Sequence, residues 1–340
     1  MPPSLILAHD LGTTGNKATL FAADGAVIAS TFAPYDTSYP QPNWAEQAPA
    51  DWQAALLDST RWLLAAAAEA GPSAADVAVV SFSGHMNGAL AVDAAGRPLR
   101  PAIIWADQRA AAQADFIRER CGEAEVYRLT GNRISPAYTA AKLLWIKDNQ
   151  PEVYRRIHCV LQAKDYAAFL FSGVMTTDTS DASLTLLLDL KKRGWAEPLL
   201  EQLRLDAAML PPIFPSAQVI GGVTAQAAAA TGLRPGTPVV IGGGDGACAT
   251  VGAGSVRPGD AYNYIGSSSW VALTTAKPVL DPARRTFNLA HLDPALNVAL
   301  GAMQTAGGAF DWFERLLRGD PATEPIYQDL DALAADLPPG

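Results

Sequence analysis

Cysteine is scarce in this sequence of 340 residues, and its spacing argues against two kinds of site. The three cysteines, Cys121, Cys159 and Cys248, stand far apart and are odd in number. Such a set predicts neither a disulfide framework nor a zinc site. Because structural disulfides belong to oxidising compartments, a reducing cytoplasm is the expected location.

Basic residues and long apolar runs are also in short supply. The 25 Lys and Arg residues are outnumbered by 34 Asp and Glu residues, which gives a net charge of −9 at pH 7. Nucleic acids and anionic membranes favour a basic face, so neither is expected as a partner. The apolar run before Asp10 is short and has no basic segment ahead of it, and "WLLAAAAEA" is too short for a bilayer. We therefore expect neither a signal peptide nor a membrane span.

Apolar residues, by contrast, make up 49% of the chain, and its length exceeds that of one ordinary domain. We expect two domains, or one domain and part of another. Apolar runs predict strands at 5–9, 17–21, 27–30, 77–83, 90–92 and 237–241, and helical periodicity predicts helices at 51–70, 110–120 and 140–149. An Asp-Gly pair at 24–25 and the segment "DAAGR" predict hairpins. The chain should therefore open as an antiparallel meander.

The pattern of predicted elements at the start of the chain recurs near Arg257. The segment "AYNYIGSSSWVALTT" again predicts a strand, a glycine-hydroxyl turn and a strand. Two halves built alike indicate a duplicated α/β fold with a cleft between two lobes. We place the division in the region 247–256, with domains at 1–248 and 249–340.

The segment "DLGTTG" places a carboxylate and two hydroxyls in a glycine turn between two predicted strands. Backbone N–H groups in such a turn, together with Thr13 and Thr14, suit the terminal phosphate of a nucleotide. Phosphate would repel Asp10, so the natural role of this carboxylate is to hold Mg²⁺ through water. A plain hairpin turn is the alternative, with even odds. The chain has no phosphate loop of the form G-x-x-x-x-G-K-S/T.

A second glycine-rich segment, "GGGDGACA", follows the strand predicted at 237–241. Gly242, Gly244 and Ala247 satisfy a loose dinucleotide-binding pattern, which would fit a dehydrogenase, but Asp245 inside the turn would repel a pyrophosphate. Asp245 is better interpreted as a carboxylate at a helix N-terminus that faces a cleft and accepts a proton. A simple N-cap aspartate is the alternative, and both roles could coexist.

Two further segments carry polar groups suited to sugar hydroxyls. "SFSGHMNGAL" sets His85, Met86 and Asn87 at the end of a strand, although a lone histidine is more often structural. "IIWADQR" combines Trp105, Asp107 and Arg109. An aromatic face with charged hydrogen-bonding groups suits a sugar. A partly buried structural ion pair is the alternative for the charged residues.

Taken in order, these segments resemble the FGGY family of carbohydrate kinases, most closely its xylulokinase-like members. "DLGTTGNK" resembles the first phosphate loop of the family, "GGGDGACATVGAG" the segment with the catalytic aspartate, and "YIGSSSW" the second phosphate loop. "RPAIIWADQR", "KLLWIKDN", "AKDYAAFLFSGVMTTDTSDAS" and "AGGAFDW" resemble further family segments. The resemblance runs from about residue 5 to about residue 317.

This resemblance implies an actin-like, ribonuclease-H-like fold of two lobes and ATP-dependent phosphorylation of a sugar hydroxyl, with a pentulose such as D-xylulose as the expected substrate. It implies Asp245 as the catalytic base and Asp10 beside Mg²⁺. The residues expected to contact the sugar are His85, Met86, Asn87, Trp105, Asp107 and Asp245. Those expected to contact the ATP phosphates are Thr13, Thr14, Gly266, Ser267, Gly307 and Asp311.

Two departures from the family pattern leave alternatives open. The family typically has Q-M-H-G where this chain has His85-Met86-Asn87-Gly88, which puts the identity of the sugar in question. The adenine-contacting glycine loop of the family is not found, so the second lobe is expected to be incomplete. A truncated, non-catalytic sugar-binding remnant or sensor, or a kinase for another ketose or polyol, are the alternatives. Oligomeric state is undetermined, and a homodimer is compatible with the sequence.

Overall fold

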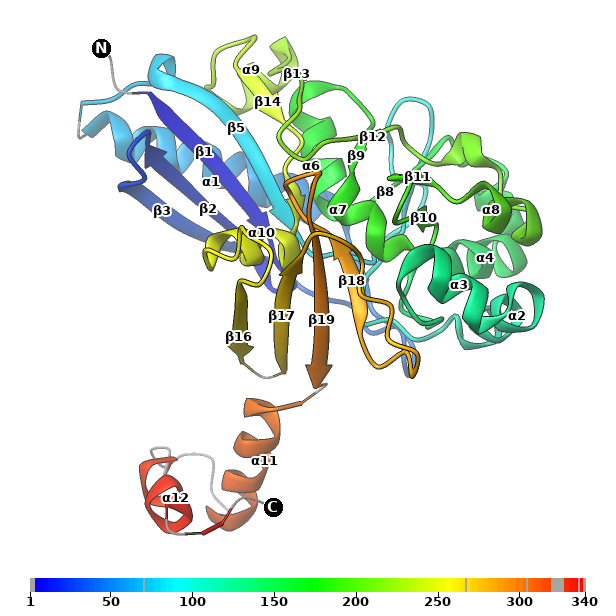
Figure 1. Cartoon of the computed structure of the whole chain (residues 1–340). Coiled ribbons are helices and arrows are strands. Elements are labelled where there is room, and N and C mark those ends of the chain that lie inside the picture. Colours follow the sequence, from blue (N-terminus) through cyan, green and yellow to red (C-terminus); the bar gives the residue numbers. More distant parts are fainter. Residues whose placement is uncertain are drawn as a thin grey trace.

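Two sheets, one large and one small, organise the chain (Figure 1). The computed structural model describes residues 4–69, 71–266, 268–303, 305–318, 327–335 and 337–338. The large sheet has the strand order β13-β14-β5-β1-β2-β3, and β15 also pairs with β5. Its strands are β1 (Leu5–Leu11), β2 (Gly15–Ala22), β3 (Val27–Pro34), β5 (Val77–Gly84), β13 (Val219–Gly222), β14 (Pro238–Val240) and β15 (Gly243–Gly244).

The predicted opening meander is confirmed. β1, β2 and β3 pair antiparallel in sequence order, whereas β5 pairs parallel to β1. The predicted strands and helices agree with the structure within two residues at each end, except that β3 continues to Pro34. The extension was missed because β3 is largely exposed along its length, so no apolar run marks its end.

One face of the large sheet is covered by helices. Leu5, Leu7 and Leu11 of β1 point to this face and are fully buried, whereas Ile6, Ala8 and Asp10 between them are partly or fully exposed and His9 is buried. The three leucines pack in one hydrophobic cluster with α1 (Pro49–Glu69), α6 (Ala163–Ser172) and α9 (Ala225–Thr231). Burial of each leucine side chain stabilises the folded state by about 1.5–3 kcal/mol. The alternation of leucines with other residues therefore decides which face of the strand meets the core.

A second hydrophobic core lies in the helical region, by which we mean α2 to α5 and α8. These helices are α2 (Ala111–Cys121), α3 (Glu123–Thr130), α4 (Thr139–Asn149), α5 (Pro151–Tyr154) and α8 (Glu197–Leu203). Short strands and one short helix connect the region to the large sheet. The helix is α7 (Thr179–Ala182), and the strands are β4 (Glu46–Gln47), β6 (Leu90–Val92), β7 (Ala102–Ile103), β8 (Cys159–Leu161), β9 (Thr177–Asp178), β10 (Leu188–Asp189), β11 (Gly194–Trp195) and β12 (Ile213–Phe214). No helix in the described part of the chain is long and apolar enough to cross a membrane.

The small sheet has the order β16-β17-β19-β18 and contains the predicted second strand-turn-strand unit. Its strands are β16 (Ala261–Ile265), β17 (Ser269–Thr275), β18 (Phe287–Ala290) and β19 (Asn297–Met303). The predicted division after residue 248 falls inside α10 (Asp245–Gly252), and the domain boundary stays a prediction.

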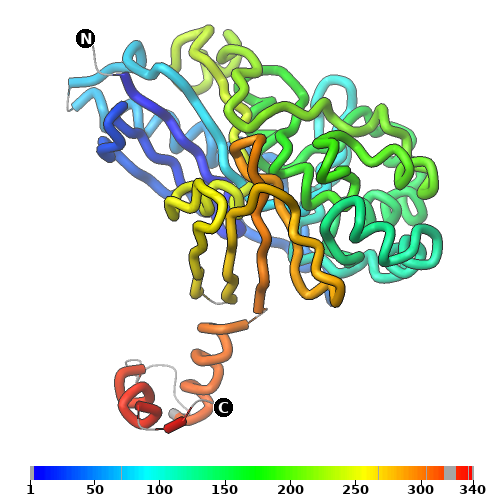
Figure 2. Tube along the Cα trace, in the orientation of Figure 1, coloured from blue at the N-terminus to red at the C-terminus, as the bar shows by residue number. Residues whose placement is uncertain are grey.

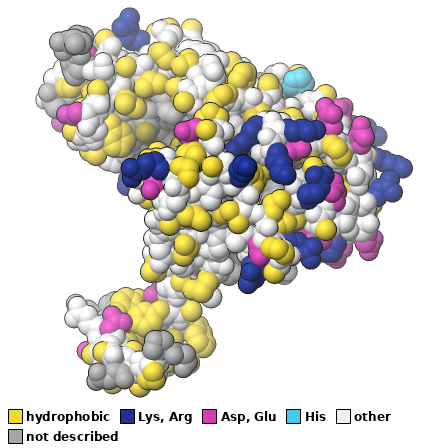
Figure 3. Space-filling model, in the orientation of Figure 1, with side chains coloured by type: hydrophobic (Ala, Val, Ile, Leu, Met, Phe, Trp, Pro, Cys, Tyr) yellow, Lys and Arg dark blue, Asp and Glu magenta, His cyan; other side chains and the backbone are white. Residues whose placement is uncertain are grey.

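The last described elements, α11 (Gly307–Arg318) and α12 (Tyr327–Ala334), lie beyond the end of the small sheet and away from the rest of the molecule (Figure 2). Several of their large apolar side chains are exposed, among them Trp312, Leu316 and Leu333. On the face drawn in Figure 3, Lys and Arg side chains gather over the middle of the molecule and the helical region, and apolar side chains dominate over α11 and α12.

Candidate functional site

The carboxyl ends of three parallel strands bring two carboxylates together. Asp10 on β1 pairs in register with Ser83 on β5, and Ser83 pairs with Gly243 on β15. Asp245 follows two residues later, as the first residue of α10. The Ser83 hydroxyl donates a hydrogen bond of 2.8 Å to Asp10 Oδ1. Ligand sites in α/β sheets favour this edge, because loops diverge there and leave polar groups accessible.

Asp245 has the environment of a proton acceptor. Asp245 has an exposed surface, yet the protein atoms around its carboxylate partly desolvate it and raise its pKa from 3.8 to about 7. The backbone N–H of Gly246, which donates to Oδ1 at 2.7 Å, lowers the pKa, and the nearby charge of Asp10 raises it. The N-cap of α10 is Gly244, without a side-chain cap bond, so the simple N-cap interpretation of Asp245 is wrong.

The glycines around Asp245 serve packing. A Cβ atom on Gly242 would lie 1.8 Å from the Phe82 carbonyl oxygen, and the residue has φ +73°. A Cβ atom on Gly244 would lie 2.6 Å from Met86 Sδ. These glycines therefore let the turn approach β5 and Met86 closely, which accounts for the loose dinucleotide pattern without a dinucleotide.

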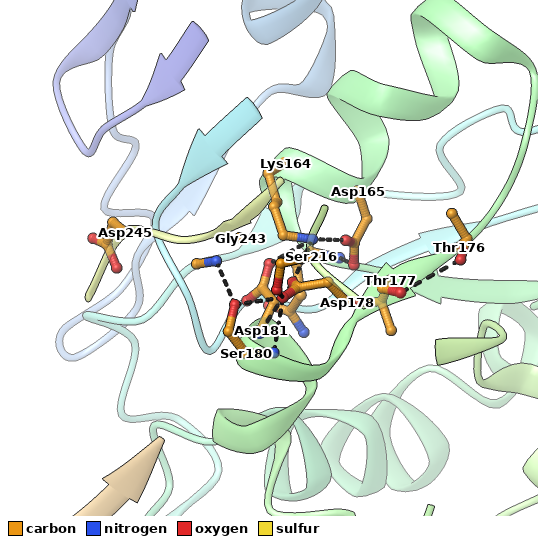
Figure 4. A network of polar contacts seen from close by, with 12 residues as sticks. Lys164, Asp165, Thr176, Thr177, Asp178, Ser180, Asp181, Ser216, Gly243 and Asp245 are labelled. Atoms are coloured by element: carbon orange, nitrogen blue, oxygen red, sulfur yellow. Dashed lines mark hydrogen bonds and ion pairs between the residues drawn. The ribbon is translucent and has the colours of Figure 1, made fainter. Parts of the chain in front are cut away.

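Ser180 holds the turn that precedes Asp245 (Figure 4). The backbone N–H of Gly244 donates to Ser180 Oγ at 3.0 Å. The Ser180 hydroxyl donates in turn to Asp178 Oδ2 at 2.6 Å, and the Ser216 hydroxyl donates to the same oxygen at 2.6 Å. Ser180 and Asp178 are fully buried. A chain of hydrogen bonds thus connects the Asp245 turn to a buried charge cluster.

That cluster is built around Lys164, which has no exposed surface. Its Nζ lies 2.5 Å from Asp165 Oδ1, 3.0 Å from Asp178 Oδ1 and 3.5 Å from Asp181 Oδ2. Burial lowers the pKa of Lys164, but the three carboxylates outweigh it and raise that pKa above its usual value. Burial raises the pKa values of Asp165 and Asp181.

Lys164, Asp178 and Ser180 were not among the predicted site residues. The available signal was a lysine and three aspartates within one otherwise apolar and hydroxyl-rich stretch, 163–183, because buried charges persist only when they are paired.

The turn between β1 and β2 is a hairpin turn, and it is anchored on both sides. The Gln47 side chain donates to the Thr13 carbonyl at 2.7 Å, and Trp105 Nε1 donates to Thr13 Oγ1 at 2.9 Å. The Tyr35 hydroxyl donates to the Gly12 carbonyl at 2.6 Å. Thr14 is exposed, so its hydroxyl is available to a ligand.

The second predicted phosphate-contacting group is assembled from two elements. Gly266 lies in the turn between β16 and β17, and its carbonyl accepts a hydrogen bond of 2.9 Å from the N–H of Gly307, where α11 begins. Asp311, one turn further along α11, accepts a hydrogen bond of 2.8 Å from the Tyr327 hydroxyl of α12. Ser267 lies outside the described residues.

Asn87 and Trp105 line a cavity of about 930 Å³ between the helical region and the small sheet. Asn87 has φ +65°, and its carbonyl accepts a hydrogen bond of 2.7 Å from Lys142 Nζ. Its Oδ1 is buried and has no partner among the described residues. Met86 is buried against Gly244. The segment Met86-Asn87 therefore runs from the Asp245 turn to the cavity.

His85 and Asp107 are placed differently from that pair. His85 is buried with its ring edge-on to Trp52, and burial lowers its pKa to about 4, with help from the charge of Lys142. Asp107 is fully buried, and its oxygens accept hydrogen bonds from Arg109 and from the backbone N–H of Ala45. The structural ion pair, the alternative that the sequence left open, fits Asp107. Neither ring nitrogen of His85 has a hydrogen-bond partner among the described residues, so the role of this histidine stays a prediction.

Comparison with known proteins shows which family the chain resembles. The family model described as "FGGY family of carbohydrate kinases, N-terminal domain" matches residues 5–252. The xylulose kinase of Escherichia coli (strain K12) is 33% identical over 97% of this chain and 67% of its own length, and that of Bacillus subtilis (strain 168) is 30% identical over 96% and 65%. The chain thus spans about two thirds of the length of these relatives.

The fold is shared as well. The crystal structure of xylulose kinase from Rhodospirillum rubrum superposes with a TM-score of 0.92 at 31% identity, covering 99% of this chain and 68% of that one. The expected actin-like, ribonuclease-H-like fold is therefore confirmed. The family model, the relatives and the shared fold agree: the chain belongs to the FGGY family of carbohydrate kinases.

Proposed function

We propose that this protein transfers the terminal phosphoryl group of ATP to a hydroxyl of a sugar, with a pentulose such as D-xylulose as acceptor. The observation that carries the proposal is the placement of Asp245, a carboxylate with a pKa near 7, beside Asp10 at the carboxyl ends of β1, β5 and β15. The similarity to proteins named xylulose kinase supports the choice of acceptor.

Asp245 acts as the base in this proposal. Its pKa lies near the working pH, so about half of the carboxylate is ionised before the reaction and can take the proton of the attacking hydroxyl. The hydroxyl oxygen forms the new bond to phosphorus, the bond from phosphorus to the leaving oxygen of ATP breaks, and ADP departs. Such a reaction depends on positioning and charge neutralisation more than on covalent help. Asn87, Met86 and Trp105 orient the acceptor.

The donor side fits a nucleotide with Mg²⁺. Asp10 is exposed, and among the described residues its carboxylate has one side-chain hydrogen-bond partner, Ser83. The described residues contain no cluster of three His, Cys, Asp or Glu side chains that could enclose a metal. Mg²⁺ commonly takes one or two carboxylates together with water and substrate phosphates, so Asp10 would be sufficient. When bound, Mg²⁺ offsets the charge of the phosphates. Thr13, Thr14, Gly266 and Gly307 are the proposed phosphate-contacting residues, and Ser267 and Asp311 complete the expected set.

Replacement of Asp245 tests the proposal. Asp245→Asn keeps the shape and the acceptor for the Gly246 N–H but removes the proton acceptor. We expect kcat for ADP release with D-xylulose to fall by about 10²–10⁴-fold. Calorimetric affinity for D-xylulose should change little.

Asp58→Asn, an exposed carboxylate paired with Arg61, is the matched control and should retain kcat. If the native chain binds D-xylulose but releases no ADP above background, it is a sugar-binding protein and not a kinase.

A further inference from the structure

The two segments that are proposed to hold the sugar are joined by backbone bonds on one side only. Asn87 follows β5 and Trp105 follows β7, and both residues line the cavity of about 930 Å³. Ala89 and Ile103 exchange backbone hydrogen bonds of 2.9 and 3.2 Å. Between this bridge and the cavity, no backbone hydrogen bond among the described residues joins the two segments. The spacing of Asn87 and Trp105 at the cavity therefore depends on side chains.

Lys142 on α4 connects the two segments at this point, and its side chain has no exposed surface. Its Nζ donates hydrogen bonds of 2.7 Å to the Asn87 carbonyl and 2.8 Å to the Ile104 carbonyl, so one ammonium group binds both segments. Asn87 has a left-handed φ of +65°, and the bond from Lys142 holds its carbonyl in that orientation. Thr139, one turn earlier on α4, donates to the next carbonyl, that of Gly88, at 2.8 Å. Of these two α4 residues, only Lys142 bonds to both segments in the described part of the chain.

The ammonium group of Lys142 forms no ion pair with a carboxylate of the described residues. Desolvation lowers its pKa to about 7, the charge of Asp107 opposes this shift, and the charge of Arg109 adds to it. Asp107 is already bound by Arg109 at 2.7 Å and by the Ala45 N–H at 2.6 Å. A buried ammonium without a counter-ion costs free energy, and its hydrogen bonds to the two carbonyls offset part of that cost. A methionine would fill the same space without the cost, so the charge points to a role beyond packing.

We propose that Lys142 is a positioning residue of the acceptor site, which sets the spacing of Asn87 and Trp105 through the Asn87 and Ile104 carbonyls. Lys142 is not itself among the described residues that line the cavity, so it acts on the sugar through these two segments. The inference rests on the proposed function, because it names a residue that builds the proposed sugar site. Hydrogen bonds from a charged donor are stronger than those from a neutral one, and a site that is held in the binding geometry loses less free energy when the sugar orders it.

Removal of the ammonium group tests the role. Lys142→Met keeps an unbranched side chain in the buried space and removes the donors to both carbonyls. By calorimetry without ATP, we expect the dissociation constant for D-xylulose to rise by about tenfold or more, because the sugar must then order the two segments itself. Calorimetry below the melting temperature measures the affinity of folded molecules, so a loss of stability alone would leave the dissociation constant unchanged. An affinity equal to that of the native chain would overturn the proposal.

Two variants on the same helix serve as comparisons. Lys147→Met also removes a bond from Nζ to a backbone carbonyl, that of Arg204 at 2.6 Å, but Lys147 is exposed and does not line the cavity. It should bind D-xylulose as the native chain does. Thr139→Val removes the bond to the Gly88 carbonyl and leaves the bonds of Lys142 in place, so its affinity should fall less than that of Lys142→Met. Equal losses in Thr139→Val and Lys142→Met would mean that the Asn87 segment alone matters, and the proposed link to Trp105 would be wrong.

A pH series tests the same role with Lys142 in place, and it decides the question alone if Lys142→Met does not fold. It uses Asp245→Asn, which removes the carboxylate of this site that titrates near pH 7. The other charged or titratable groups that face Lys142 are His85, whose pKa of about 4 keeps it uncharged above pH 6, and the ion pair of Asp107 and Arg109. As the pH rises from 6 to 9 the ammonium loses its proton, so D-xylulose should bind about threefold or more weakly at pH 9. A constant affinity from pH 6 to pH 9 would overturn the proposal.

Binding and turnover separate this inference from the function on which it rests. If the native chain binds D-xylulose without yielding ADP, and Lys142→Met loses that binding, the kinase proposal fails and the role of Lys142 stands. If the native chain yields ADP while Lys142→Met binds D-xylulose as before, the kinase proposal stands and the role of Lys142 fails.

Discussion

The carboxylate of Asp245 connects pH directly to the proposed activity. Its pKa is raised to about 7 mainly by desolvation, and only the ionised form accepts a proton. We expect log kcat/KM to fall with unit slope as the pH drops below about 7 and to level off above it. A pH profile of ADP release at saturating ATP measures this. A profile that stays flat down to pH 5 would remove Asp245 as the base.

Asp10 provides an internal test of that assignment. Its negative charge contributes to the raised pKa of Asp245, so Asp10→Asn should lower that pKa and move the acid limb of the profile to lower pH. The same variant should need more Mg²⁺ for half-maximal rate, because it loses the proposed metal-holding carboxylate. If the limb stays in place, the two carboxylates do not interact through the cleft.

The same pKa shift bears on stability. Because the folded state binds the Asp245 proton more tightly than the unfolded state, this group lowers the free energy of unfolding as pH rises from about 4 to about 7. Asp245→Asn removes this loss. The melting temperature of the variant should therefore equal or exceed that of the native chain at pH 8, with the difference shrinking toward pH 4. A clear fall in melting temperature at pH 8 would assign the residue a structural role.

At the scale of an element, the Ser180 hydroxyl binds the backbone of β15, and among the described residues Ser216 makes a comparable hydrogen bond but none to β15. Ser180 and Ser216 both donate to Asp178 Oδ2 at 2.6 Å, but only Ser180 also accepts from the Gly244 N–H. Ser180→Ala leaves that buried N–H unpaired, at a cost of about 1–3 kcal/mol. We expect kcat to fall while the KM for sugar stays within a few-fold, because the turn that carries Asp245 loosens and the Asn87 segment does not.

Ser216→Ala is the control for this prediction. It removes an equivalent bond to Asp178 without touching the Gly244 N–H, so it should lower stability while kcat is retained. Steady-state kinetics and urea unfolding on both variants give the comparison. Equal losses of kcat would mean that the network acts on the fold as a whole.

Lys164 tests the buried charge cluster itself. Lys164→Met leaves Asp165, Asp178 and Asp181 without their shared cation, and breaking a buried ion pair in this way costs about 3–5 kcal/mol. The deficit should be smaller at acid pH, because protonation of the carboxylates relieves their repulsion. Urea unfolding at pH 5 and pH 8 measures both effects. Lys147→Met, at an exposed contact on α4, should cost far less.

At the scale of the whole molecule, two buried asparagines dock the small sheet on the helical region. Asn132 Nδ2 donates to the Asn288 carbonyl at 3.1 Å, and the Asn288 N–H donates to Asn132 Oδ1 at 3.2 Å. Asn132→Leu leaves these groups on β18 unpaired. We expect backbone amides of β18 and β19 to exchange with solvent faster, whereas those of β1 and β5 keep their protection.

Asn149→Leu serves as the control for this docking experiment. Within the described part of the chain its side chain bonds only to the Trp145 carbonyl of α4, so exchange in β18 should remain as in the native chain. Uniformly faster exchange across both sheets in Asn132→Leu would show that the two sheets unfold as one unit.

Local order was predictable from the sequence wherever one face of an element is buried. The alternation in β1 and the apolar stripe of α1 appear as residue periodicity, because burial acts on every second or every third to fourth side chain. The glycine-hydroxyl turn at 12–14 was likewise predictable, since it contains unusual groups between two apolar runs.

The sequence by itself determined the family, the elements and the candidate base, because each depends on residues close together in the chain. Only the tertiary structure decided what surrounds them. It buried Asp107 and His85, linked Ser180 to Gly244 across 64 positions, and set Lys142 between the carbonyls of Asn87 and Ile104. Burial and pairing of a charge depend on neighbours that are distant in sequence. The residue pattern within one segment does not show which neighbours these are.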